Sequence, residues 1–273
     1  MIRRFAGSIR QGFEPEVVDT ISRMTVKPTS NEASLYNTFI VEIKEDNGLN
    51  LGEISLNQLF DFIYIRASHD KQAALLNWVS SSFDSVLVPD LAFTKYEGFE
   101  GDLSGYIDTT FNDLSSRKAS TVLENIFSYS YIWKDATDGL KSAYGVQNGG
   151  VAGLRNLPKI SGNTQITEIS TASNPTTNAI GFYGQKSIGR NAQNNLESLT
   201  TWNAFEQTNL QQTNVAFING TISEHATNRI DIPDKGGFKG NFGVSFFCYG
   251  GGTIDQQALR TSIINLRNNL ALL

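Results

Sequence analysis

The first third of the chain carries apolar residues at helical spacing. A helix is predicted to start at Pro15, because proline suits the first helical position, where its missing N–H is not needed. Its apolar face consists of Val17, Val18, Ile21 and Met24. Lys27-Pro28 ends this helix, since proline cannot continue one.

A second helix is predicted directly after this proline. Thr29 and Glu32 have the spacing of a capping box, in which each side chain accepts a hydrogen bond from the backbone N–H of the other residue. The helix then carries an apolar stripe of Tyr36, Phe39, Ile40 and Ile43. It is expected to end at the turn sequence Glu-Asp-Asn-Gly, residues 45–48.

Shorter elements and a third helix follow. Ser55 is placed to cap a short helix, and FDFIYIRA at 60–67 is rich enough in β-forming residues to be a strand. Ser68 is expected to cap a helix whose apolar face is Ala74, Leu75, Trp78 and Val79. Residues 1–82 are therefore predicted to form a mostly helical N-terminal region with one strand.

The pattern changes at Phe83, where short apolar runs separated by Gly, Asn, Asp and Ser replace the helical spacing. The strand candidates are FSYSYIW (127–133), AIGFYG (179–184), NVAFI (214–218), TISEHA (221–226) and FGVSFFCYG (242–250). Asn219-Gly220 lies between two of these runs, and this pair tolerates the positive φ angles of a type I′ hairpin turn.

The last residues return to helical spacing. Thr253 and Gln256 form a second capping box, and the apolar face that follows is Leu259, Ile263, Leu266 and Leu270. Short strands followed by one amphipathic helix predict a mainly β fold, a two-sheet antiparallel sandwich closed by a helix at 253–273. The predicted organisation is thus a helical lead-in, 1–82, and a sandwich domain, 83–273.

Charge and composition exclude several classes of protein. Charged residues make up 18% of the chain and the net charge is −5, with no basic run or face of the kind that binds nucleic acid. No stretch approaches the length of a membrane span or a secretory signal, so we expect a protein made in a cytoplasm and not anchored in a membrane. Arg3, Arg4 and Arg10 form a small basic start, which suits a solvated terminus or a docking arm.

Catalytic and metal-binding patterns are weak. Ser68-His69-Asp70 contains the residue types of a hydrolase triad, but adjacent residues cannot converge on one line of proton transfer. His225 falls in a predicted strand, where a surface role is expected, and Cys248 falls in an apolar run that predicts a buried, inert thiol. Two separated histidines and one cysteine do not form a typical zinc site, so no metal or cofactor is expected.

Glycoside hydrolases that share the sandwich architecture need two carboxylates a few ångströms apart. A compact strand of the form Glu-x-Asp-x-x-Glu would indicate this, and none occurs. The glycine-rich segments at 236–240 and 250–252 fit neither a Walker loop nor a dinucleotide fingerprint. The expectation is therefore a protein without enzymatic activity.

A sugar-binding site is predicted in the stretch from Ser161 to Asn214, which is nearly free of charge and dense in Asn, Gln, Thr and Ser. Sugars are bound by amide and hydroxyl groups around an aromatic platform. Trp202 is the candidate platform, with Asn203, Arg190 and Asn191 as polar neighbours. The alternative is that Trp202 is a core or interface aromatic and that the amides solvate long loops.

Two segments carry a family resemblance. ASHDKQAALLNWVSSSFD at 67–84 and AFTKYEGFEGDLSGYIDTTFN at 92–112 resemble a module of tailed-phage and prophage structural proteins, in which a helical lead-in enters a concanavalin A-like (laminin-G-like) jelly roll. The Asn219-Gly220 hairpin and the helix after Gly251 continue the pattern. The resemblance spans about residue 15 to 273 and is weak between 135 and 213.

The resemblance implies local structure around its glycines. Gly98, Gly101 and Gly105 are expected to let the chain turn as it enters the sandwich. The early strand that follows would begin with Tyr106, Ile107 and Phe111. The calcium sites of some laminin-G-like domains are not carried over, because their ligands find no residue-by-residue match.

The function implied by the resemblance is that of a non-enzymatic bacteriophage virion structural protein, of the head-fibre, tail-fibre, spike or decoration type. Its expected partners are other virion proteins, further copies of itself, with a trimer favoured, and host-surface glycans. The alternatives are a freestanding lectin-like carbohydrate-binding module and a glycoside hydrolase on the same sandwich.

Overall fold

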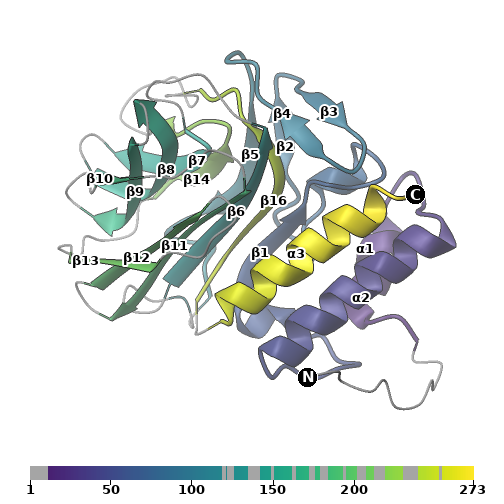
Figure 1. The fold of residues 1–273 in the computed structure, drawn as a ribbon. Coiled ribbons are helices and arrows are strands. Elements are labelled where there is room, and N and C mark those ends of the chain that lie inside the picture. Colours follow the sequence, from purple (N-terminus) through teal and green to yellow (C-terminus); the bar gives the residue numbers. More distant parts are fainter. Residues whose placement is uncertain are drawn as a thin grey trace.

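The computed structural model describes residues 12–118, 121, 126–134, 142–148, 151–161, 164–171, 176–178, 184–192, 195–201, 207–211, 219–229, 239–251 and 254–273. These residues form three layers, in which a pair of helices covers part of one β-sheet and that sheet packs on a second (Figure 1). The fold is mainly β, as the sequence predicts.

The two N-terminal helices begin at the residues that the sequence predicts. They are α1 (Pro15–Arg23), α2 (Ser30–Asp46) and α3 (Gln256–Leu270), with the short 3₁₀ helices η1 (Leu56–Gln58) and η2 (Ala73–Leu75). The capping box at the start of α2 is confirmed, with Thr29 and Glu32 exchanging both hydrogen bonds. In α1 the buried face includes Val17, whereas Val18 is exposed.

Sheet A has the strand order β13-β12-β11-β6-β16-β4-β3, and β1 also pairs with β16. Its strands are β1 (Phe60–Ile65), β3 (Ala92–Thr94), β4 (Gly98–Glu100), β6 (Ile126–Lys134), β11 (Gly184–Ala192), β12 (Asn195–Thr201), β13 (Gln207–Gln211) and β16 (Gly243–Gly250). The described pairings in this sheet are antiparallel, as the sequence predicts.

Sheet B has the order β10-β9-β8-β7-β14-β5-β2. Its strands are β2 (Val86–Val88), β5 (Tyr106–Asn112), β7 (Tyr144–Asn148), β8 (Val151–Ser161), β9 (Thr164–Thr171), β10 (Thr176–Asn178) and β14 (Thr221–Glu224). The two-residue strand β15 (Asn228–Arg229) joins β7 in parallel, and the other pairings are antiparallel.

The centre of sheet A is buried on both faces, which explains its continuous apolar sequences. Along β16, Phe246 and Cys248 face the helices, while Phe247 and Tyr249 enter the core between the sheets. A strand between two layers needs apolar residues at every position, whereas a strand with one wet face alternates. The predicted buried thiol of Cys248 is confirmed, and burial raises its pKa well above the ordinary value.

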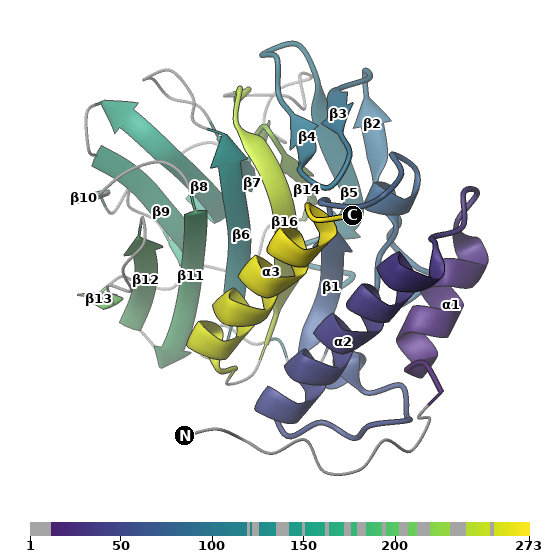
Figure 2. The same cartoon turned by 45° about the vertical axis from the view of Figure 1, so that its right-hand side comes forward.

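The helices α2 and α3 lie side by side over β1, β16 and part of β6, while β11–β13 extend beyond them (Figure 2). The predicted stripes of both helices are buried, and the α3 stripe consists of Leu259, Ile263, Leu266 and Leu270. The predicted cap of α3 is wrong. Asp255 is the N-cap and accepts the backbone N–H of Ala258, because its carboxylate stands one residue before the first helical residue, Gln256.

The helix predicted after Ser68 is also wrong, since only the 3₁₀ turn η2 forms there. Bonds to β1 replace helical ones: the N–H of Trp78 donates to the carbonyl of Ile63, and the Asn77 amide oxygen accepts the N–H of Ile63. Ser68 is not a cap. The Asp70 carboxylate instead accepts the N–H groups of residues 72 and 73.

Strand predictions are confirmed at β1, β5, β6 and β16, and in part at β14. Residues 179–183 and 214–218 lie outside the described residues, so the strands predicted there and the hairpin predicted at Asn219-Gly220 stay predictions. Gly98 lies within β4 rather than at a turn, with φ of 116°. A Cβ there would lie 2.1 Å from the carbonyl oxygen of Val244, so the glycine permits close strand contact.

One buried lysine joins the helical elements. The Lys44 ammonium donates to Glu14 at 2.8 Å, to Glu16 at 2.6 Å and to the carbonyl of Glu53 at 2.7 Å. Glu16 in turn accepts the N–H groups of Ser55 and Leu56. These paired charges fix α1, α2 and the start of η1 to one another.

One buried ion pair joins the two sheets. Arg66, directly after β1, donates to the carboxylate of Glu224 on β14, with Nη2 2.5 Å from Oε1. Both side chains are excluded from solvent. The guanidinium also donates to the carbonyl of Ala74 and to the hydroxyl of Ser85, and it lies 4.1 Å from the ring centroid of Tyr64. Its three nitrogens are therefore all used.

Removal of the apolar contact beneath α3 tests the helix–sheet layer. Leu259 is 1% exposed and Leu272 is 84% exposed. Leu259→Ala is expected to lower the free energy of unfolding by about 2–5 kcal/mol, through lost burial and the cavity left behind. Urea unfolding of both variants measures this, and Leu272→Ala should change stability by less than about 0.5 kcal/mol. Similar effects at the two positions would contradict the packing described.

Removal of one partner tests the pair between the sheets. Glu224→Gln leaves the Arg66 charge buried without its counterion, and about 3–5 kcal/mol of stability should be lost. The exposed pair of Lys71 and Asp90 is the control, since Asp90→Asn should cost at most about 1 kcal/mol. A Glu224→Gln variant as stable as Asp90→Asn would show that the buried pair has no structural role.

Candidate functional site

The sequence-predicted sugar site lies largely outside the described residues. Trp202 and Asn203 are among the residues not described, and only the backbone of Arg190 and Asn191 is described, in β11. Arg190 is in register with Ile126, at the beginning of β6. The convergence of these four residues stays a prediction.

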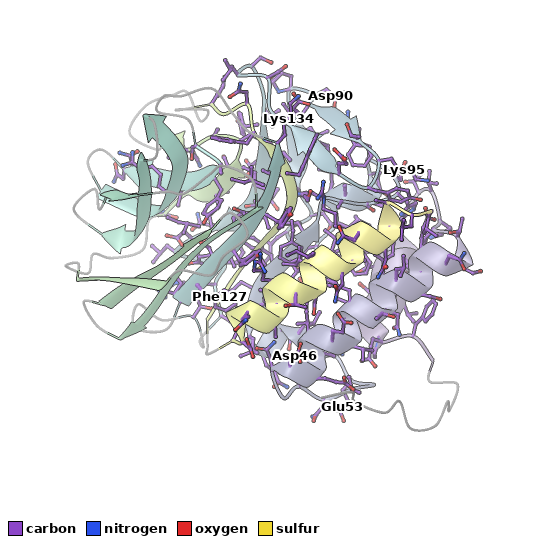
Figure 3. All side chains as sticks on the ribbon, in the orientation of Figure 1. Asp46, Glu53, Asp90, Lys95, Phe127 and Lys134 are labelled. Atoms are coloured by element: carbon purple, nitrogen blue, oxygen red, sulfur yellow. The ribbon has the colours of Figure 1, made fainter. Side chains whose placement is uncertain are left out.

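The described residues present a different aromatic row, along β6. Phe127, Tyr129, Tyr131 and Trp133 alternate along this strand, and alternate residues of a strand share one face of the sheet. Phe127 and Tyr129 are buried beneath the helices, whereas Tyr131 and Trp133 are partly exposed. Figure 3 labels Phe127 near the N-terminal end of α3 and Lys134 at the opposite end of the strand. The helices therefore cover the first two aromatic side chains of this row and leave the last two, Tyr131 and Trp133, partly exposed to solvent.

Trp133 packs against a glycine of the neighbouring strand. A Cβ at Gly243 would lie 2.4 Å from Cε2 of the indole, so only glycine lets the ring approach β16 this closely. The indole Nε1 is buried and has no hydrogen-bond partner in the described part of the chain. The ring is therefore held by packing against the backbone, on one of the central strands of sheet A.

Tyr131 is covered in part by an arginine from α3. The guanidinium carbon of Arg267 lies 5.6 Å from the centroid of the Tyr131 ring, within the range of a cation–π contact. Nη2 of Arg267 lies 3.8 Å from Oε1 of Glu97, which is an ion pair without a hydrogen bond. Nε of Arg267 is buried and has no hydrogen-bond partner among the described residues. Tyr131, Trp133 and Arg267 are called the β6–α3 site below.

Polar groups border the β6–α3 site. Lys134 forms an ion pair with Glu100 of β4, and both side chains are partly exposed. On the other side, the backbone of Gln185 in β11 is in register with Tyr131, and Thr201 of β12 is in register with Gln185. Partly exposed aromatics bordered by charged and polar residues are typical of a surface that binds polar ligands with an apolar face.

The Ser68-His69-Asp70 sequence is not a triad. Nδ1 of His69 lies 3.1 Å from the hydroxyl of Tyr36 and 3.4 Å from that of Ser68, while Nε2 lies 3.0 Å from the carbonyl of Val26. Since a carbonyl only accepts, Nε2 donates there and Nδ1 is left as an acceptor. The Asp70 carboxylate accepts backbone N–H groups instead of orienting the imidazole, so its role is structural, as expected.

The surface role predicted for His225 is wrong. His225 directly follows β14 with φ of 59° and is fully buried. Among the residues that the structure describes, neither ring nitrogen has a hydrogen-bond partner. Its backbone joins Ala143 to Gly240 through two hydrogen bonds. Burial, and secondarily the positive charge of Arg66, lower the pKa of His225 to about 3, and Asp102 opposes this weakly. The isolated residue gives no sequence signal for burial, since the burial comes from the contact of two loops.

Two further features are not found in the described part of the chain. Among the described residues, no group of three His, Cys, Asp or Glu side chains could hold a metal ion. No helix of the described chain has the length and apolar character to cross a membrane.

Comparison of the sequence with protein-family models and with curated proteins finds no match. Comparison of the structure finds similar folds at very low identity. A mutant of Trypanosoma rangeli sialidase with trans-sialidase activity aligns with a TM-score of 0.51 and 8% identity, over 88% of this chain and 40% of the sialidase. This likeness concerns the fold alone.

Two further structures align with TM-scores of 0.49. Domain 4 of an extracellular arabinanase from Geobacillus stearothermophilus, in complex with arabinotriose, is 8% identical over 75% of this chain and 98% of that domain. The binding domain of botulinum neurotoxin serotype D is 10% identical over 77% of this chain and 52% of the toxin domain. The alignments thus span about half or less of the toxin and sialidase chains.

Acid sensitivity tests the burial of His225. The pKa of His225 is about 3 in the folded protein, whereas the unfolded chain has the ordinary histidine pKa of 6.5. Below pH 6.5 the unfolded chain therefore takes up a proton that the folded protein does not. The stability contributed by His225 is therefore complete above pH 6.5 and falls as the pH drops toward 3. Between pH 7 and pH 5 the loss should be about 2 kcal/mol.

Urea unfolding at both pH values measures this loss, with His225→Asn as the comparison, because asparagine tolerates the positive φ angle and does not titrate. The variant should lose about 2 kcal/mol less than the native protein between pH 7 and pH 5. An identical pH dependence of the two proteins would mean that His225 is accessible to protons in the folded state.

Proposed function

We propose that this chain is a non-enzymatic structural protein of a bacteriophage particle, displayed as a fibre, spike or decoration, that binds host-surface glycans. The observation that carries the proposal is the pair of partly exposed aromatics, Tyr131 and Trp133, on a central strand of sheet A. A sugar ring presents an apolar face to an aromatic platform and its hydroxyl groups to polar neighbours. The particle is proposed from the resemblance of 67–84 and 92–112 to phage structural proteins.

The finer fold assignment belongs to the same proposal. Two antiparallel sheets stacked face to face, with a helix after the last strand, support a concanavalin A-like jelly roll. The helical lead-in also supports a particle component, because a freestanding lectin-like module needs no such segment. On this proposal the chain assembles inside the host cell and is part of the virion.

The contacts of the buried carboxylates among the described residues support a protein without catalytic activity. The buried ones are engaged in structure: Glu14 and Glu16 bind Lys44, and Glu224 binds Arg66. Asp61 accepts hydrogen bonds from Lys118 and Thr121. Burial, opposed by these hydrogen bonds, raises the pKa of Asp61. A glycosidase needs two carboxyl groups facing one open site.

Self-association is part of the proposal. Virion appendages are symmetric assemblies, and a trimer would present three copies of a weak glycan site at once. Linked sites raise the overall affinity without new contacts, by a factor of roughly 100 to 10,000 when all of them can bind together.

Substitution of the platform tests glycan binding. Trp133→Ala should weaken binding to host cells and to immobilised host glycans by at least about tenfold, the effect of losing some 1.4 kcal/mol. Trp202→Ala, measured in parallel, tests the predicted platform in the stretch from Ser161 to Asn214. The control is Trp78→Phe, which alters a tryptophan that is buried and so cannot contact a ligand at the surface. Unchanged binding by both Trp133→Ala and Trp202→Ala would refute these platforms.

The thermal transition of each variant separates lost binding from lost folding. Particle membership is tested by mass spectrometry of purified virions and by imaging with an antibody against this chain. Its absence from particles, together with glycan binding, would favour the freestanding lectin-like module. Release of reducing sugar from the bound glycan would favour the hydrolase.

A further inference from the structure

The arginine of the β6–α3 site has unused hydrogen-bonding capacity. Nε of Arg267 is buried without a partner, and its ion pair with Glu97 spans 3.8 Å, beyond hydrogen-bond distance. Arg66 and Arg23 differ, because each uses Nε, Nη1 and Nη2 in hydrogen bonds. Arg267, whose side chain is 25% exposed, therefore has a buried Nε donor that no group of the described chain accepts.

From this arrangement we infer that the β6–α3 site binds a saccharide that carries a carboxylate, and that Arg267 receives this carboxylate. A guanidinium offers parallel N–H donors that match the two oxygens of a carboxylate. The guanidinium carbon lies 5.6 Å from the centroid of the Tyr131 ring, so a carboxylate bound to Arg267 would lie close to this aromatic ring. The inference rests on the proposed glycan-binding function and specifies its ligand class.

The distances along β6 suit a ligand that spans the site. Tyr131 and Trp133 are two residues apart, so their Cα atoms are separated by about 6.5–7 Å along the strand. One saccharide unit with its acidic group can therefore contact Arg267 and Tyr131 while the next unit contacts Trp133. The two aromatic rings provide the apolar contact, and the arginine provides selectivity for charge.

Glu97 is the group that competes with such a ligand. Its side chain is 39% exposed, and among the described residues its carboxylate makes only the long ion pair with Arg267. The backbone carbonyl of Glu97 accepts a hydrogen bond from Ser245, so the main chain stays fixed when the side chain moves. An incoming carboxylate replaces the Glu97 carboxylate at Arg267. Removal of the Glu97 charge should therefore tighten the binding of an acidic saccharide.

The test compares acidic probes with their neutral methyl esters. Oligogalacturonate is compared with its methyl ester, and 3′-sialyllactose with its methyl ester, by calorimetry or surface binding on the 273-residue chain at two salt concentrations. The native protein should bind at least one acidic probe ten times more tightly than its neutral counterpart, and added salt should weaken this preference.

Three variants assign the preference to Arg267. Arg267→Gln should reduce binding of the acidic probe at least tenfold and leave the neutral probe unchanged. Arg260→Gln, the same change two turns earlier on α3, should retain the preference. Glu97→Gln should increase affinity for the acidic probe two- to tenfold, and it leaves Arg267 and the aromatic rings in place even if Arg267→Gln fails to fold.

The failures of the two proposals are distinguishable. Equal binding of acidic and neutral probes, lost in Trp133→Ala, would overturn the ligand class and leave glycan binding intact. A Glu97→Gln variant that binds the acidic probe no better than the native protein would overturn the role of Arg267. Absence of binding to every saccharide tested, with a folded protein, would overturn both proposals.

Discussion

The ion pair between Arg66 and Glu224 is the contact on which the sandwich depends. It joins the end of β1 in sheet A to β14 in sheet B, and both charges are excluded from water. Burial of two charges is costly unless every donor and acceptor finds a partner. Arg66 meets this requirement by binding Ala74 and Ser85 as well, which also holds the segment after β1 against the sheets. A shifted packing of the sheets would leave these charges unpaired, so the pair selects one arrangement.

Much of the fold could be predicted from the sequence because its signals are local. The capping box at Thr29 and the apolar stripes of α2 and α3 depend on residues three and four positions apart. The failure at 68–82 has a tertiary cause. Ala74, Leu75, Trp78 and Val79 do have helical spacing, but the backbone bonds that a helix would use are taken by β1 and by Arg66. Spacing alone does not reveal that a distant strand offers better partners.

The candidate site could be predicted only in part. The alternating aromatics of FSYSYIW are visible in the sequence and correctly predict a strand. Which of them reach the surface depends on how α3 crosses the sheet, and α3 lies more than a hundred residues later in the chain. Arg267 comes to Tyr131 only through this crossing, so no local motif joins them. His225 is similar, since its burial results from a contact with the loops around Gly101 and Gly240.

The position of β16 in sheet A has a consequence for biosynthesis. This strand is the last described strand in sequence, yet it lies between β6 and β1, with Tyr249 in register with Phe62 and Ser128. The earlier strands cannot form the complete sheet until residue 250 has been made. During synthesis their apolar faces remain without the central strand, a state that favours aggregation. The time for which the nascent chain needs protection is therefore set by the last strand, and a truncation before residue 243 removes the middle of the sheet rather than its edge.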